Sequence, residues 1–318
     1  MKILYVVSRP LEINTSASIR SRAIIDGLLE LGHEVDLITT QPDKNHTHYD
    51  NSILNKRIHT LYLELRGVQR LAKIGRKYKY IKSLRKFVYN LMSRYNIYDN
   101  LSGITRYASK LNIDDDMYDL IISSSDPKSS HLFVSKMIER GLIRNTPWIQ
   151  IWGDPFLSDI TRRNRILDPI IKKEENKLIS RATKVVYVSK LTLEEQKKLY
   201  HKHVEKMFYS PIPYVKKEIY PIDSLPEESL TFLYCGDYYS NVRNIKPLYE
   251  AIKNSENKLI ICGNTNIKLE STERIKIYPR VNFEKTKEFE SSCDVLVHLS
   301  NLTGTQIPGK IYQYSGTT

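Results

Sequence analysis

The chain has 318 residues, 41% of them hydrophobic, and it carries 49 Lys and Arg against 36 Asp and Glu, for a formal net charge of +13. This length predicts two domains. No apolar run approaches the roughly 20 residues that a membrane-spanning helix needs, and the start lacks the small-residue cleavage site of a signal peptide. The positive charge indicates an anionic partner, which leaves nucleic acid, a membrane surface and a phosphorylated substrate open.

Strand and helix patterns alternate through the first part of the chain. Pro127 is placed to open a helix at its first turn, and Gly32 is placed to end the first helix. From the apolar spacing, strands are expected at 2–8, 34–39, 118–123, 148–152, 184–189 and 206–209, and helices at 16–31, 166–180 and 191–200.

A stretch with four prolines and no periodicity follows, and it predicts a linker at 211–228. Beyond it the alternation resumes, with strands expected at 230–235, 258–262, 274–278 and 293–299 and helices at 244–254 and 283–291. This rhythm on both sides of the linker predicts two doubly wound α/β domains, 1–210 and 229–318. Ligands bind such sheets at the carboxyl ends of the strands, so residues that directly follow a strand are the first candidates for a site.

The cysteines and histidines show no metal-ligand spacing. Cys235, Cys262 and Cys293 each sit in or beside an apolar run, which is typical of buried free thiols in a reducing cytoplasm. His298 stands inside an apolar strand pattern and is expected to be a core residue. No glycine-lysine phosphate loop and no Ser-His-Asp arrangement is present.

Several segments match a known pattern in order and spacing. In the first domain they are Leu29-Glu-Leu-Gly-His-Glu-Val-Asp, Trp148-Ile-Gln-Ile-Trp-Gly-Asp-Pro-Phe and Ala182-Thr-Lys-Val-Val-Tyr-Val-Ser. In the second they are Phe232-Leu-Tyr-Cys-Gly, Arg243-Asn, Leu259-Ile-Ile-Cys-Gly, Cys293-Asp-Val-Leu-Val and Pro308-Gly-Lys-Ile-Tyr-Gln-Tyr. Together they resemble glycosyltransferase family 4. The resemblance covers most of the chain except roughly 45–115. It implies a GT-B fold of two facing Rossmann-like domains, the second incomplete because family members normally continue further.

The resemblance implies a donor site in the second domain. In the family, basic residues at the positions of Arg243 and Lys310 hold the diphosphate of a nucleotide sugar without a metal; the alternative for each is a solvated surface cation. Such cations stabilise the charge that develops on the leaving diphosphate. The other donor-binding candidates are Gly236, Gly263, Pro308, Gly309 and Gln313.

Two positions depart from the family pattern. Thr305 and Gln313 stand where the family commonly has two glutamates, the second of which binds the nucleotide ribose. The carbonyl oxygen of Gln313 can still accept a hydrogen bond from a ribose hydroxyl, without the added strength of a charged acceptor.

The acceptor is expected on the first domain. Asp154 follows the strand at 148–152 and precedes a proline, so its carboxylate could orient an acceptor hydroxyl or take its proton. The alternative is a turn aspartate, which the Asp-Pro pair favours. Ser18 and Arg20 lie at the first strand-to-helix crossing and are expected to face the cleft, with helix capping as the alternative role of Ser18.

A strongly basic stretch lies in the first domain. Between Lys56 and Arg94 twelve Lys or Arg stand against one acid, Glu64. From Val68 to Tyr95 apolar residues recur every three or four positions with basic residues on the other faces. This pattern predicts one amphipathic helix or two short ones, which lie on an anionic membrane or pack on their own domain.

The sequence therefore predicts, through the resemblance, a retaining glycosyltransferase. It would move a sugar from a nucleotide-sugar donor to a polysaccharide or lipid-linked acceptor in cell-surface glycan synthesis, with no metal or other cofactor. A cytoplasmic location is expected, with peripheral contact to the inner face of the plasma membrane through 56–94 as an option.

Three other functions stay open. The first is a catalytically impaired remnant that at most binds nucleotide, favoured by the two family departures and the missing end. A basic nucleic-acid-binding protein is disfavoured, because the charge lies on one stripe and no nucleic-acid motif is present. A GT-B sugar-nucleotide epimerase would need a carboxylate and histidine set that the sequence does not display.

Overall fold

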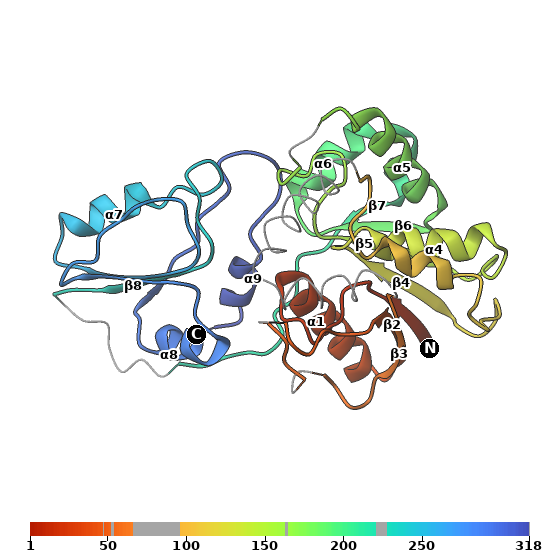
Figure 1. The fold of residues 1–318 in the computed structure, drawn as a ribbon, viewed down its shortest axis with the longest axis horizontal. Helices are drawn as coiled ribbons and strands as arrows, with labels where there is room; N and C mark the ends of the chain where they lie inside the picture. The colour runs from red at the N-terminus through yellow and green to blue at the C-terminus, as the bar shows by residue number, and fades with distance from the viewer. Residues whose placement is uncertain (47, 52–53, 66–95, 163–164, 221–227, 318) are drawn as a thin grey trace, which may run out of the picture. The chain divides into compact units, whose positions relative to one another are not determined.

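The computed structural model describes residues 1–46, 48–51, 54–65, 96–162, 165–220 and 228–317. The chain divides into two compact units, Met1–Val215 (unit 1) and Lys216–Thr318 (unit 2), each built on a parallel sheet with helices between the strands (Figure 1). The predicted amphipathic helix from Val68 to Tyr95 and part of the predicted linker lie outside the described residues. In the described part of the chain, no helix is long and apolar enough to cross a membrane.

The sheet of unit 1 has seven strands in the order β3-β2-β1-β4-β5-β6-β7, and every neighbouring pair is parallel. The chain runs outward from β1 to β3 and then returns to β4 on the other side of β1, so the strand order reverses there. Ligands bind parallel sheets near such a reversal. The strands are β1 (Lys2–Val6), β2 (Glu34–Thr40), β3 (His59–Leu63), β4 (Leu120–Ser124), β5 (Trp148–Trp152), β6 (Lys184–Tyr187) and β7 (Met207–Tyr209).

The edge strand β3 was not predicted. It pairs with β2 alone, and only one of its five residues is buried. Because two of the five are also polar, it lacks the apolar run of the inner strands. The other six strands lie where the apolar runs predict them, within about two residues at their ends.

Two helices of unit 1, α1 and α6, begin at a side-chain cap from a residue close by in the sequence. At the start of α1, Thr15 and Ser18 form a reciprocal capping box, and Gly32 follows the helix with a φ of +81°. Ser189 caps α6 by accepting a hydrogen bond from the Thr192 backbone N–H. The helices are α1 (Ser16–Glu30), α4 (Ser129–Glu139), α5 (Asp168–Arg181) and α6 (Lys190–Leu199), and short 3₁₀ turns lie at Ser102–Tyr107 (η1) and His201–Lys206 (η2).

A buried polar chain crosses the aromatic core of unit 1. The indole N–H of Trp148 donates to the Ser123 hydroxyl at 2.8 Å, and that hydroxyl lies 2.7 Å from Nδ1 of the fully buried His131. Burial lowers the pKa of His131 to about 3, which keeps the ring neutral. Trp148, Ser123 and Nδ1 of His131 are thus paired within the core, whereas Nε2 of His131 has no hydrogen-bond partner among the described residues.

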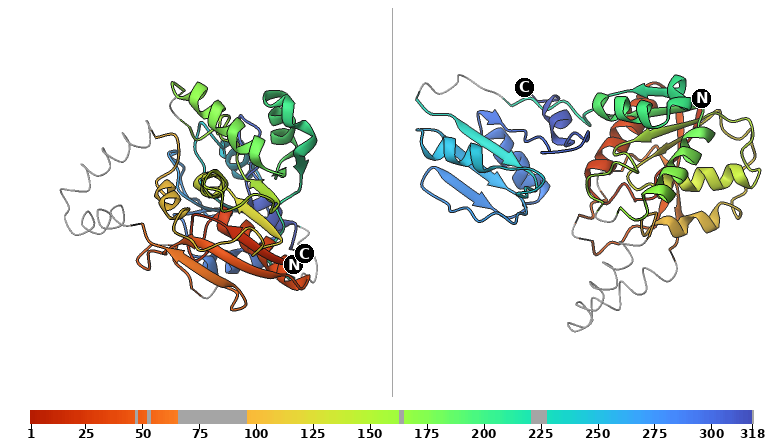
Figure 2. Two further views of the ribbon diagram at one scale, coloured as in Figure 1. Left: turned by 90° about the vertical axis from the view of Figure 1, so that its right-hand side faces the viewer. Right: turned by 90° about the horizontal axis from the view of Figure 1, so that it is seen from above.

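Unit 2 has a four-stranded parallel sheet in the order β10-β9-β8-β11, whose strands lie side by side in the right-hand view of Figure 2. Its elements are β8 (Thr231–Cys235), α7 (Lys246–Lys253), β9 (Lys258–Cys262), β10 (Ile275–Tyr278), α8 (Phe283–Ser291), β11 (Val295–Leu296) and α9 (Lys310–Tyr314). The strand predicted at 293–299 is wrong in length, because only two residues pair with β8.

Helices cover both faces of this sheet, with α7 on one side and α8 on the other (Figure 1). Successive side chains of each strand point to opposite faces of the sheet, so alternate residues pack against α7 and α8. Tyr249 of α7 packs in a cluster with Tyr234, whereas Phe289 of α8 packs with the thiols of Cys235 and Cys262. All three cysteines are free, as predicted; Cys235 and Cys262 are buried, and Cys293 is half-buried.

Candidate functional site

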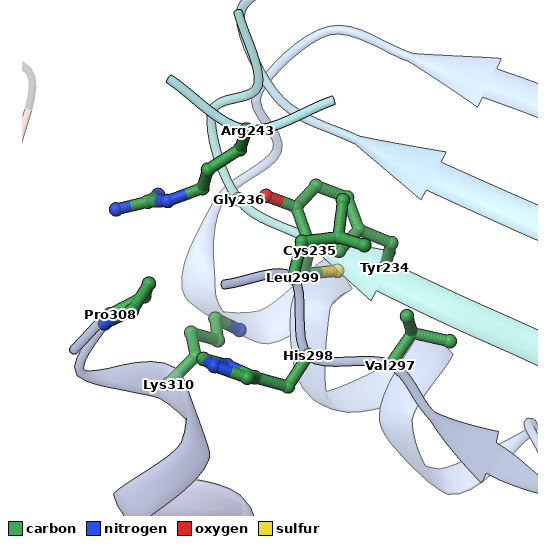
Figure 3. A pocket seen from close by; sticks show the side chains of 9 residues that line it. All are labelled: Tyr234, Cys235, Gly236, Arg243, Val297, His298, Leu299, Pro308 and Lys310. Atoms are coloured by element: carbon green, nitrogen blue, oxygen red, sulfur yellow. The ribbon is translucent and has the colours of Figure 1, made fainter. Parts of the chain in front are cut away.

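Unit 2 has a pocket at the carboxyl edge of its sheet, where the loops after β8 and β11 meet the start of α9 (Figure 3). Four predicted donor-side residues line it: Gly236, Arg243, Pro308 and Lys310. Tyr234, Cys235 and the segment 297–299 complete the lining. Gly263, Gly309 and Gln313 are not among the residues that line this pocket.

Neutral groups hold Arg243. Its Nε donates to Oδ1 of Asn301 at 2.8 Å, and Nη1 donates to the Asp237 carbonyl oxygen at 3.3 Å. Asn301 is itself fixed, because its amide donates to the Gln306 carbonyl oxygen at 2.9 Å. No carboxylate of the described residues forms an ion pair with Arg243, so its positive charge faces the pocket without a counter-ion.

Lys310, by contrast, has an acidic partner. Its Nζ lies 3.3 Å from Oε1 of Glu290 on α8 and 5.4 Å from the centre of the Tyr314 ring. The Glu290 side chain is only 8% exposed, and its second oxygen lies 3.6 Å from Nζ of Lys287. The two cations that line the pocket are therefore not equivalent, since an anion at Lys310 also meets the charge of Glu290.

The two glycines after β8 and β9 pack against each other. A Cβ on Gly263 would lie 2.0 Å from the Gly236 carbonyl oxygen, which no side chain can tolerate. The Gly236 N–H donates to the Cys262 carbonyl oxygen at 2.8 Å. Gly263 thus has a steric role, since it lets the loop that carries Gly236 lie close to the end of β9.

His298 lies in a different place from the one predicted. Because β11 ends at Leu296, His298 stands in the loop beyond it and lines the pocket instead of the core. Partial burial and the nearby Arg243 lower the pKa of His298, so the ring is neutral near neutral pH.

Unit 1 gathers charged residues at the carboxyl edge of its own sheet. Ser124 of β4 lies beside Ile151 of β5, so the loops that follow these neighbouring strands meet. They bring together Asp126, Lys128, Asp154 and Asp159. We call these four residues the acid cluster.

Lys128 organises the acid cluster. Its side chain is 7% exposed, forms an ion pair with Asp126 and lies 3.8 Å from Oδ2 of Asp159. Burial pushes the pKa of Asp126 upward, but the Lys128 charge and hydrogen bonds from Asp154 and Lys128 outweigh burial and hold it below its usual range. Loss of hydration and the negative charge of Asp126 raise the pKa of Asp154 to about 7. The two carboxyls thus share one proton across the mildly acidic range.

Arg20 is buried against the two loops that follow β4 and β5. It is 5% exposed, and its Nη2 donates to the Ser125 carbonyl oxygen. The guanidinium occupies the space beside Gly153, where a Cβ would lie 2.3 Å from Nη1. Arg20 therefore connects α1 to the loops that carry the acid cluster.

Ser18 is 1% exposed and caps α1. Its Oγ accepts a hydrogen bond from the Thr15 N–H at 2.7 Å and donates to the Ile13 carbonyl oxygen at 2.6 Å. Of its two predicted roles, the structure shows the cap.

A buried carboxylate fixes the segment that follows Asp154. Glu175 of α5 has no exposed surface, and it accepts hydrogen bonds from the backbone N–H of Phe156 at 2.7 Å, the N–H of Leu157 at 2.9 Å and the hydroxyl of Tyr200 at 2.7 Å. Glu175 therefore has a structural role: its hydrogen bonds hold the loop after β5 in one conformation.

Three members of the acid cluster were missed by the sequence analysis: Asp126, Lys128 and Asp159. A usable signal exists for the first two, because Ser-Asp-Pro-Lys (125–128) directly follows a predicted strand in the same way as Asp154 does. Within the described residues, no group of three or more His, Cys, Asp or Glu side chains is arranged to hold a metal ion. Independence from metal stays a prediction.

Comparison with known proteins identifies the architecture. No protein-family model matches the chain, and no curated protein matches its sequence. Among solved structures, the catalytic domain of starch synthase IV from Arabidopsis thaliana, bound to ADP and acarbose, matches 93% of this chain and 77% of its own at a TM-score of 0.59 and 9% identity. A structure from E. coli, described as trehalose-6-phosphate bound with UDP-2-fluoro glucose, matches 99% of this chain and 81% of its own at a TM-score of 0.57 and 9% identity.

An α,α-trehalose 6-phosphate synthase from Burkholderia multivorans matches 99% of this chain and 81% of its own at a TM-score of 0.53 and 13% identity. The chain has a GT-B fold. Identities this low show the fold alone, so membership of family 4 continues to rest on the sequence resemblance.

Proposed function

We propose that this GT-B protein is a glycosyltransferase that uses a nucleotide-sugar donor, with the donor diphosphate held in the pocket of unit 2. The observation that carries the proposal is that Arg243 and Lys310, the two cations expected to hold the diphosphate, line one pocket at the carboxyl edge of a parallel sheet. Solved structures with this fold were bound to ADP and to UDP-2-fluoro glucose, which supports the same ligand class here.

The chemistry follows from the charges in the pocket. When the bond between the sugar and the diphosphate breaks, negative charge grows on the leaving phosphate, and cations fixed in advance stabilise that state. Arg243 suits this role, because its planar guanidinium donates several hydrogen bonds and binds phosphate bidentately. Gly236 leaves room for a phosphate beside β8, and the Gln313 carbonyl oxygen would accept a hydrogen bond from the ribose.

We place the acceptor at the acid cluster of unit 1. A carboxyl with a pKa of about 7, as Asp154 has, is suited to take a proton from an acceptor hydroxyl near neutral pH. Retention of configuration, with attack from the face that the diphosphate leaves, is proposed from the family resemblance. A polysaccharide or lipid-linked acceptor in cell-surface glycan synthesis is proposed on the same ground.

Membrane contact is the part of the proposal that the sequence of 56–94 supports. Each basic residue close to an anionic surface contributes about 1 kcal/mol. We expect the protein to sediment with vesicles that contain anionic lipid and not with neutral vesicles. Sedimentation that is independent of anionic lipid would remove this part of the proposal.

The central test is a thermal-shift screen with UDP, GDP, ADP and their sugar derivatives. A ligand of the native state at about 100 times its Kd stabilises it by about 2.7 kcal/mol, which raises Tm. We expect one nucleotide class to raise Tm in the wild type, and most of that effect to be lost in Arg243→Gln. Lys276→Gln is the matched control, since it removes a cation from β10, which does not line the pocket. If none of the nucleotides changes Tm, the proposal fails.

A nucleotide-binding protein without transfer activity is the second candidate. The Glu290 charge beside Lys310 and the residues Thr305 and Gln313 in place of two glutamates favour it. Nucleotide binding without release of UDP, GDP or ADP from the sugar donor would establish that the protein binds nucleotides but does not transfer sugars. Transfer that persists in a chelator would support the predicted independence from metal.

A further inference from the structure

Glu290 is an acid that lies directly behind a cation of the proposed phosphate site. It is 8% exposed, and its Oε1 lies 3.3 Å from Nζ of Lys310, which lines the pocket. On its other side, Oε2 lies 3.6 Å from Nζ of Lys287, and the Tyr220 hydroxyl lies 3.4 Å from the same oxygen. Contacts on both sides hold the carboxylate in place.

The local charges around Glu290 balance. Lys287 also pairs with Glu218, at 3.2 Å, so two lysines face two acids in this part of unit 2. Arg243 then supplies the net positive charge of the pocket, because its hydrogen-bond partners are neutral. A phosphate that reaches Lys310 comes close to a negative charge that water screens poorly, since Glu290 is nearly buried.

The two ligands of a glycosyltransferase donor site differ in charge. In a nucleotide sugar each phosphate of the diphosphate carries one negative charge. After transfer, the terminal phosphate of the free nucleoside diphosphate gains a second ionisation, with a pKa near 6, and so carries about one more negative charge at neutral pH. Repulsion from a fixed carboxylate grows with the charge of the ligand.

Building on the proposed function, we propose that Glu290 makes the pocket discriminate against the free nucleoside diphosphate in favour of the sugar-bound donor. The extra charge of the product falls on the terminal phosphate, the group from which the sugar has left. Lys310 attracts both ligands, and Glu290 offsets that attraction more strongly for the product. The pair thus holds the donor and favours release of the product.

The test compares binding of donor and product in Glu290→Gln, by calorimetric titration at neutral pH. The probe pairs are UDP and UDP-glucose, GDP and GDP-mannose, and ADP and ADP-glucose. We expect the variant to bind both members of the active pair more tightly, with the gain for the diphosphate roughly three- to tenfold larger than that for the sugar diphosphate. Glu290→Met, also uncharged and of similar size, should shift the ratio in the same direction if the Gln variant folds poorly.

Glu218→Gln is the matched control, because it removes the same charge from the other partner of Lys287 without touching Lys310. It should leave the ratio of the two affinities unchanged. An equal gain for both ligands, or weaker binding of both, would mean that Glu290 only positions Lys310, and the inference would be wrong while the proposed function stands. If neither ligand of any pair binds the wild type, the proposed function fails and the inference with it.

Discussion

In unit 1 the charged side chains at the sheet edge neutralise one another, whereas in unit 2 Arg243 keeps a charge that no acid in the described residues balances. Lys128 is 7% exposed and pairs with acids on two loops. The cations of the unit 2 pocket are half-buried, and Arg243 rests on neutral oxygens. The same location in two parallel sheets thus has a different chemical character: carboxyls that share a proton in unit 1, and a positive charge on neutral partners in unit 2.

The largest expected effect breaks the balance in unit 1. Lys128→Met leaves the carboxylates of Asp126 and Asp159 without their buried cation, so we expect the free energy of unfolding to fall by about 3 kcal/mol. Urea unfolding followed by circular dichroism measures this loss. Lys136→Met is the control, because Lys136 is 36% exposed and forms a surface pair with Glu139, which contributes less than about 1 kcal/mol. Equal losses in the two variants would contradict the comparison.

The next effect separates the two cations of unit 2. Arg243→Gln should weaken binding of the active nucleoside diphosphate by roughly 30-fold, because a lost charged hydrogen bond costs about 2 kcal/mol. Lys310→Met should weaken it by less, roughly threefold to fivefold, because lysine offers a phosphate a single point charge whereas the arginine fork can bind it bidentately. Titration calorimetry on both variants checks the order, and a larger loss at Lys310 would reverse the assignment.

A smaller effect tests the shared proton in unit 1. The pKa of Asp154 is about 7 in the folded protein and near 4 in an unfolded chain. The folded state therefore holds an extra proton between these values, and stability falls as the pH rises from about 4 to about 7. Asp126→Asn removes the neighbouring charge and lowers the pKa of Asp154, so this fall should shrink by about 1 kcal/mol.

Unfolding at about pH 5 and about pH 8 measures that difference. Asp168→Asn, which removes a carboxylate paired with Arg162, is the control and should keep the pH dependence of the wild type. If Asp126→Asn keeps it as well, the two carboxyls do not share a proton.

The smallest effect concerns Ser18, for which the sequence left two roles open. Ser18→Ala removes half of the capping box of α1 and should lower the free energy of unfolding by about 1 kcal/mol. If an acceptor is found, its apparent affinity should stay the same. A large change in acceptor affinity with unchanged stability would restore the ligand role.

The sequence predicted most of the fold because apolar runs and caps are local signals. Three of the four strands of unit 2 (β8, β9 and β10) and the helix at 283–291 lie where the periodicity places them, whereas β11 is much shorter than the strand predicted at 293–299. The edge strand His59–Leu63 was not predicted. Most of its residues are not buried, so its sequence is partly polar and lacks a continuous apolar run. Asp154 could be chosen because it follows a strand in the chain, and Arg243 because its position matches one that is basic in the family that the sequence resembles.

Contacts between residues that are far apart in the sequence could not be predicted from such local signals. Glu290 lies on a helix with no motif, and only the fold, which brings the end of α8 close to the first residue of α9, sets it against Lys310. Gly263 was a donor-binding candidate, and its steric role could not be predicted, because its need for a bare backbone comes from Gly236, a segment earlier in the chain.

The buried Glu175 has a consequence for backbone motion near the acid cluster. Its two carboxylate oxygens bind the amides of Phe156 and Leu157, residues that belong to a loop and have no strand partners. Their hydrogens should exchange with deuterated solvent as slowly as those of strand residues, because release requires a buried acid to lose its partners. The stretch that positions Asp154 would then move together with α5 and the end of α6, as one block.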